Sequence, residues 1–124
     1  MHPSQIEALS CEDMSLTDAY TSTPVAWGPN GTRTVVLRTI RGILASNTGI
    51  TTISLYFVNT DNPEAHTPVY TCDVVNDGFA VSLDEWPWYF PEESPDTHEI
   101  FVRLKGNQAG QTASVSNMTL TVNG

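Results

Sequence analysis

The chain has 124 residues, with 14 Asp and Glu against 5 Lys and Arg, and its net charge is −9. Nucleic-acid-binding proteins gain much of their affinity from Lys and Arg placed against phosphates, and anionic membrane surfaces attract basic segments. The charge therefore argues against both nucleic acid and membranes as partners. Hydrophobic residues make up 40% of the chain, which at this length is enough for one core without a metal or disulfides.

Two cysteines, Cys11 and Cys72, are present. Small secreted domains that depend on disulfides normally contain more, so we expect two free thiols, with a bridge between them as the alternative. Residues 1–16 lack the basic segment and continuous apolar run of a signal peptide. We expect the protein to be made in a cytoplasm.

From residue 18 onward, short β-branched or aromatic runs alternate with Gly, Pro, Asn and Asp, a pattern typical of antiparallel all-β domains. Turn formers at 28–31 and 46–49 flank the β-branched run 32–44. The next run, 51–59, has the period of two expected of a strand, and we expect it to pair with 67–75.

The second half of the chain continues this pattern. Asn76-Asp77-Gly78 carries the Asp-Gly turn signal and predicts a hairpin over residues 67–83. Alternation returns in 100–105 and 113–122. About seven or eight strands with regular turn signals predict an antiparallel β-sandwich, jelly-roll-like, over residues 17–124. Residues 1–16 are predicted to form an extended N-terminal arm.

The residue patterns of catalytic and metal sites are missing from the sequence. The three histidines lie apart, and a zinc site would require Cys72, His66 and His98 to converge through the fold alone. There is no G-x-S-x-G motif and no Cys-His signature of a nucleophile. We therefore predict a protein that is not an enzyme, with no catalytic residue, metal or cofactor.

Six carboxylates fall within residues 84–99 and include the pairs Asp84-Glu85 and Glu92-Glu93. Paired carboxylates could serve glycoside hydrolysis or hold Ca²⁺. The segment also contains three prolines and does not match a calcium loop, so a solvated acidic loop is the preferred interpretation.

The most unusual segment is Trp86-Pro87-Trp88-Tyr89-Phe90-Pro91. Its prolines favour a stiff, partly extended segment whose rings cannot all point inward, which predicts an exposed aromatic surface. Such a surface can anchor a protein interface, or its Trp and Tyr rings can stack on sugars. The structural alternative is that the rings close one end of the core.

Residues 23–36 and 40–48 resemble the opening of small virion proteins of tailed bacteriophages. In that pattern a strand, a Pro/Gly-Thr turn, a β-branched strand and an Asn-Thr turn follow in this order. The resemblance implies a β-sandwich or jelly-roll protein of the virion that decorates or cements the capsid, with a small head or tail component as a variant.

This resemblance implies a function through protein–protein contacts. The expected partners are the major capsid protein or neighbouring virion subunits, in a homo-oligomer for which a trimer is favoured. A carbohydrate-binding module that uses the aromatic segment is the alternative. The residues expected to make contacts lie in the arm and in the aromatic segment: Ile6, Leu9, Met14, Leu16, Trp86, Trp88, Tyr89 and Phe90.

Overall fold

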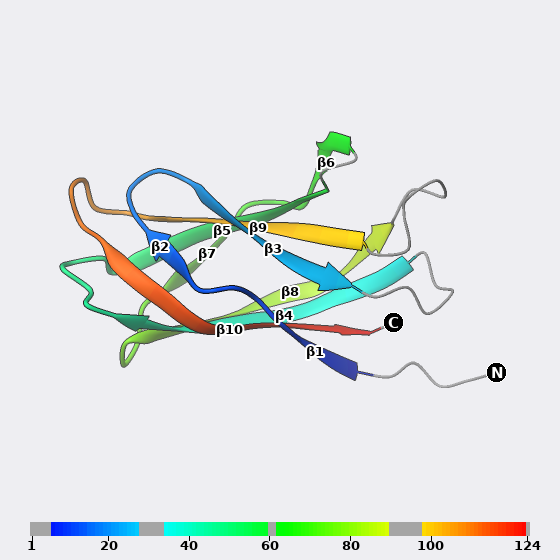
Figure 1. The fold of residues 1–124 in the computed structure, drawn as a ribbon, viewed down its shortest axis with the longest axis horizontal. Helices are drawn as coiled ribbons and strands as arrows, with labels where there is room; N and C mark the ends of the chain where they lie inside the picture. Colours follow the sequence, from blue (N-terminus) through cyan, green and yellow to red (C-terminus); the bar gives the residue numbers. More distant parts are fainter. Residues whose placement is uncertain (1–5, 28–33, 60–61, 90–97, 124) are drawn as a thin grey trace.

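The computed structural model describes residues 6–27, 34–59, 62–89 and 98–123. These residues form ten β-strands and no helix. The strands are β1 (Ile6–Ser10), β2 (Met14–Leu16), β3 (Thr21–Trp27), β4 (Thr34–Ala45), β5 (Thr52–Asn59), β6 (Asn62–His66), β7 (Tyr70–Asp73), β8 (Gly78–Tyr89), β9 (His98–Gly106) and β10 (Ala113–Asn123). They form two packed antiparallel sheets, which confirms the predicted sandwich (Figure 1).

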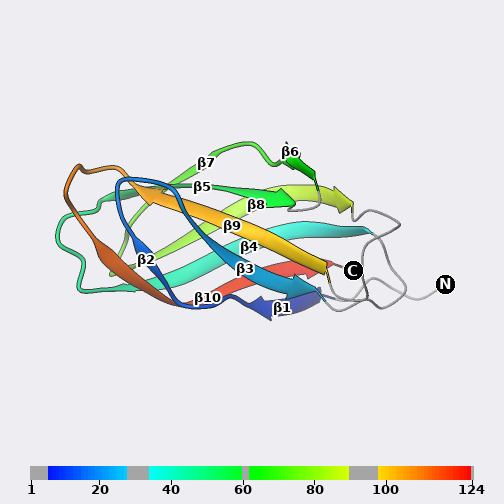
Figure 2. The same ribbon diagram turned by 45° about the horizontal axis from the view of Figure 1, so that its top comes forward.

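The strand order is that of a jelly roll. Sheet A has the order β1-β10-β4-β8, with β2 also on β10, and sheet B has the order β3-β9-β5-β6, with β7 also on β5. The pairing is nested: the first strands pair with the last strand, β3 with β9, β4 with β8, and β5 with β7. The chain therefore behaves as one long hairpin rolled into two layers. Figure 2 shows the two layers crossing obliquely.

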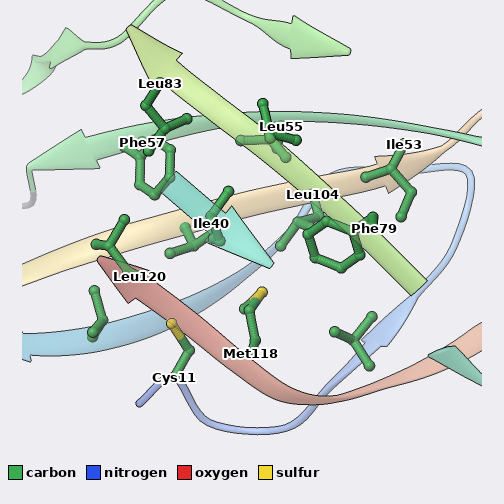
Figure 3. Close-up of a cluster of buried hydrophobic side chains, with 14 of the residues drawn as sticks. Cys11, Ile40, Ile53, Leu55, Phe57, Phe79, Leu83, Leu104, Met118 and Leu120 are labelled. Atoms are coloured by element: carbon green, nitrogen blue, oxygen red, sulfur yellow. The ribbon is translucent and has the colours of Figure 1, made fainter. Parts of the chain in front are cut away.

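The core lies between the two sheets and follows the alternation of the strands. Each long strand turns every second side chain inward, as in Ile53, Leu55 and Phe57 of β5, which are 0% exposed. Figure 3 shows buried side chains from both sheets in one cluster, among them Leu104 of β9 and Phe79 of β8. The inward positions are occupied almost entirely by aliphatic residues and Phe, and the hydrophobic effect of burying them is the main stabilising contribution.

Residues 6–16 do not extend from the domain as an arm. Residues 6–10 pair with β10 from Ile6 opposite Asn123 to Ser10 opposite Thr119, and β2 continues along the same strand. Between them, the Cys11 N–H donates to the Met118 carbonyl at 2.8 Å. The predicted boundary at residue 16 between an arm and the domain is therefore corrected. β1 and β2 pair with the edge of β10 that would otherwise be exposed, so residues 6–16 are part of the sandwich. Residues 1–5 lie outside the described residues.

The predicted hairpin over 67–83 forms only at its tip. Asn76 and Asp77 have φ of 51° and 57°, and Val75 and Gly78 exchange two backbone hydrogen bonds of 2.9 and 3.0 Å. This is the geometry of a two-residue hairpin turn. Beyond it the strands separate, since β7 pairs with β5 in sheet B, as expected for 51–59 and 67–75, and β8 pairs with β4 in sheet A. The turn thus connects the two layers.

We expect the Leu16→Ala variant to lose about 2–5 kcal/mol of unfolding free energy, because it leaves a cavity at a fully buried position. Ile6→Ala, on a residue that is 61% exposed, is the matched control and should change stability by about 0.5 kcal/mol or less. Urea unfolding measures both values. Equal losses in the two variants would show that residues 6–16 do not pack as described.

Candidate functional site

The predicted aromatic surface is largely absorbed into the fold. Trp88 is 4% exposed and belongs to the core, and Trp86 is half-buried against it. Pro87 is tolerated because β8 is an edge strand of sheet A, where a missing N–H costs no ladder hydrogen bond. The segment is therefore a strand whose two Trp side chains point the same way, with Pro87 exposed between them. The side chain of Tyr89 and all of Phe90 lie outside the described residues.

The contact residues expected in the arm are also mostly occupied within the chain. Leu16 is 0% exposed, and Leu9 and Met14 are partly buried against the core. Only Ile6 remains exposed, at 61%. Leu16 and Trp88 are thus unavailable as surface contacts, and the expectation that they lie on a free surface is wrong.

Asp84 and Glu85 lie at a break in the pairing of β4 with β8. The register moves from Leu37 opposite Trp86 to Thr39 opposite Ser82, and the two acidic residues have positive φ of 55° and 52°. Such a bulge bends the strand and turns both carboxylates to solvent, where they are exposed. Glu92 and Glu93, their partners in the hydrolase interpretation, lie outside the described residues.

Both thiols are free. Burial is the main cause that raises the pKa of Cys11 to about 12 and that of Cys72 to about 11. Cys72 stands opposite Ile53, a core position, whereas the His66 ring is exposed, so these two of the three residues that a zinc site would require do not converge. Over the described ranges, no group of three or more His, Cys, Asp or Glu residues is placed to hold a metal ion.

The native Cys11 thiol should react with a disulfide reagent at pH 8 at least about 100-fold more slowly than in denaturant, because burial holds it protonated and inaccessible. Because the pKa is raised, the buried Cys11 thiol makes its full contribution to the free energy of unfolding below pH 9, and this contribution is lost as the pH rises toward 12. Thiol-labelling kinetics on Cys72→Ala isolates Cys11. Equal rates in the native and unfolded states would contradict this burial.

A groove of about 600 Å³ lies at the surface of sheet A, within the size range of ligand pockets. We call it the sheet A groove. Its lining comes from β4, β7, β8, β10 and the segment between β7 and β8, and it includes Arg41, Ile43, Asp73, Val75, Asn117 and Thr119. Ile43 and Val75 are 49% and 64% exposed, so two large apolar side chains meet solvent at this one place.

The strand register explains why the surface is hollow here. Ile43 and Arg41 on β4 stand opposite Gly78 and Ala80 on β8, so long side chains on an inner strand face the smallest residues on the edge strand. On the other side a bulge between Ser116 and Thr119 places Asn117 at a φ of 50°. Asn tolerates this conformation, and bulges of this kind commonly re-aim side chains at functional sites.

Below the groove, Gly42 has a packing role. A Cβ added to Gly42 would lie 2.7 Å from the Phe79 ring, so only glycine leaves room for that ring at this position. The absence of a side chain lets Phe79 pack closely beneath β4 while Ile43, the next residue, faces outward.

The outward face of sheet A around the groove carries little charge. In this region the residues at the outward positions of β4, β8 and β10 are mostly small or hydroxylated, and the single charged residue among them is Arg41. These positions are Thr39, Arg41, Ile43, Gly78, Ala80, Ser82, Ser114, Ser116, Thr119 and Thr121. For a chain with a net charge of −9, a face without a carboxylate at these positions is unusual. Protein interfaces are depleted of charge at their centres in the same way.

Sequence reasoning did not find this groove. Arg41 and Ile43 are visible as members of one β-branched run, and Val75 as a residue before a turn. The register of β4 against β8 places Gly78 and Ala80 beside Ile43 and Arg41 and so forms the groove. That register cannot be obtained from one sequence.

No family model matches the chain, and a comparison with curated proteins finds no similar sequence. Within the residues described, no helix has the length and apolar character needed to cross a bilayer.

Proposed function

We propose that this protein is a structural, non-enzymatic virion protein, a capsid decoration or cement protein that stabilises a shell through protein–protein contacts. The observation that carries the proposal is the sheet A groove, where the exposed Ile43 and Val75 lie together and Arg41 and Asp73 are the charged residues of the lining. Two large aliphatic side chains beside an arginine form the kind of small apolar centre around which protein interfaces assemble.

The fold is consistent with this proposal. Jelly rolls are used by viral capsid proteins, although they also occur in lectins, so the fold alone does not assign a function. The resemblance of residues 23–36 and 40–48 to small phage virion proteins adds support from a different direction. Together they favour a virion component over a free carbohydrate-binding module that uses Trp88, because that ring is buried.

The distribution of charged residues indicates which surface of the protein faces the proposed partner. Asp13, Asp18 and Glu85 are exposed and do not line the groove, whereas Asp73 lines it and Asp77 lies in the turn beside it. Like charges facing each other would oppose association, so a neighbour would approach the apolar centre of the groove with a surface that places no carboxylate opposite Asp73. The proposed partners are the major capsid protein or other virion subunits, with a homo-oligomer, a trimer in the favoured case.

We expect Ile43→Asp and Val75→Asp each to weaken self-association and capsid binding at least about tenfold, because a carboxylate would be desolvated at the centre of the contact. Val69→Asp is the matched control, since Val69 is 60% exposed but does not line the groove. Sedimentation velocity measures the oligomer, and co-sedimentation with purified capsids measures binding. A wild-type monomer that leaves capsids bare would reject the proposed function.

A further inference from the structure

The outer face of sheet B carries a cluster of cations and tyrosines that the proposed function does not use. It consists of Tyr20, Tyr56, Arg103 and Lys105, and we call it the cation–tyrosine face. The two Tyr rings contact each other edge to face with centroids 5.0 Å apart. The Arg103 guanidinium lies 5.3 Å from the centre of the Tyr56 ring, and the Lys105 ammonium lies 4.8 Å from that of Tyr20.

Arg103 is held in one orientation before any ligand arrives. Its Nη1 donates a hydrogen bond of 2.6 Å to the Tyr56 hydroxyl, and both Tyr rings lie within cation–π distance of it. Its buried Nε has no hydrogen-bond partner among the described residues. A guanidinium that is already ordered loses little entropy on binding and can present its remaining N–H groups to a carboxylate.

The two cations have no acidic neighbours across the sheet. Arg103 stands opposite Ser22 on β3 and Tyr56 on β5, and Lys105 stands opposite Ser54 on β5. Although the chain is strongly acidic, these two adjacent positive charges have no carboxylate opposite them on the neighbouring strands. Glu99 lies on the same outward row of β9, four residues from Arg103. At physiological salt the screening length is about 8 Å, so an anion in direct contact with the two cations interacts chiefly with them.

The surroundings of the cations are hydroxylated and leave space. Ser22 and Ser54 flank Arg103 and Lys105, and Thr71 of β7 stands opposite Ser54 in the next strand. All three are short side chains with at least partial exposure. They offer hydrogen-bonding groups beside the charges without filling the surface above them.

This face differs from the sheet A groove in a way that bears on its ligand. The large hydrophobic side chains exposed in the described residues are Ile6, Ile43, Val69 and Val75, and none of them belongs to the outward rows of β3, β9 or β5. Phe101 of β9 and Val58 of β5 stand opposite each other on this face and are only partly exposed, so the face offers less apolar surface than the groove. The face fits a polar, hydroxylated ligand that carries a negative charge.

We propose that the cation–tyrosine face binds a saccharide that carries a carboxylate group. Arg103 and Lys105 pair with the carboxylate, an edge of the tyrosine pair contacts the C–H face of the sugar ring, and Ser22, Ser54 and Thr71 hydrogen-bond its hydroxyls. This site lies on the opposite sheet from the groove and adds a glycan-binding activity to a protein proposed to act by assembly.

The test is a titration of the full chain, labelled with ¹⁵N, with a galacturonic acid tetramer and with a neutral galactose tetramer at 150 mM salt. We expect shifts in amides of β5 and β9 with the acidic sugar, and binding at least about tenfold weaker with the neutral one. Arg103→Gln and Lys105→Gln should each weaken binding by a similar factor. Arg38→Gln, which removes the same charge from β4 of sheet A outside the groove lining, is the matched control and should bind as the wild type does.

Four outcomes would overturn the proposal. These are no binding of the acidic tetramer by a folded wild type, equal binding of the neutral tetramer, equal competition by inorganic phosphate, and equal binding of a tetraglutamate peptide. The last two would indicate a general anion site and recognition of an acidic polypeptide, respectively. The amide spectrum of each free variant confirms folding, and Lys105→Gln provides the test if Arg103→Gln unfolds. Oligomeric state should not change in either variant, so this result is separate from that of the groove variants.

Discussion

The pairing of the chain's first strands with its last strand is the constraint on which the rest of the structure depends. It makes β10 an inner strand of sheet A, bonded to β1 and β2 on one side and to β4 on the other. It buries Leu16 and Cys11 and leaves the Ile6 side chain exposed. By placing β10 against β4, it also sets Thr119 beside Arg41 and so forms one wall of the groove.

The two outer faces of the sandwich have different chemistry because their rows of outward residues differ. On sheet A these residues are small or hydroxylated, and the apolar side chains of the groove meet solvent. On sheet B, the charged groups of Arg103 and Lys105 lie over tyrosine rings, so that this face presents positive charge. One fold can therefore offer an assembly contact on one side and a polar recognition surface on the other.

Edge strands explain why two proline-containing segments behave as strands. Pro87 lies in β8 and Pro24 in β3, and each of these strands is at an edge of its sheet. Prolines are tolerated in edge strands, where one side of the strand has no ladder partner, and a proline there also hinders pairing with another chain. The protein is thus protected from edge-to-edge aggregation at two of its open edges, which favours association through the faces of its sheets.

The sequence by itself determined the all-β class, the pairing of 51–59 with 67–75 and the turn at Asn76-Asp77, because alternation and turn chemistry are local properties. It did not determine that residues 6–16 belong to a sheet, since pairing with β10 joins residues more than a hundred positions apart. The sequence also led to the wrong prediction that the Trp88 side chain is exposed. Whether Pro87 interrupts a strand depends on which strand forms the edge of the sheet, and this is not visible in the sequence. The groove and the cation–tyrosine face were decided only by the tertiary structure, because each depends on the register between strands, which brings together side chains from distant parts of the chain.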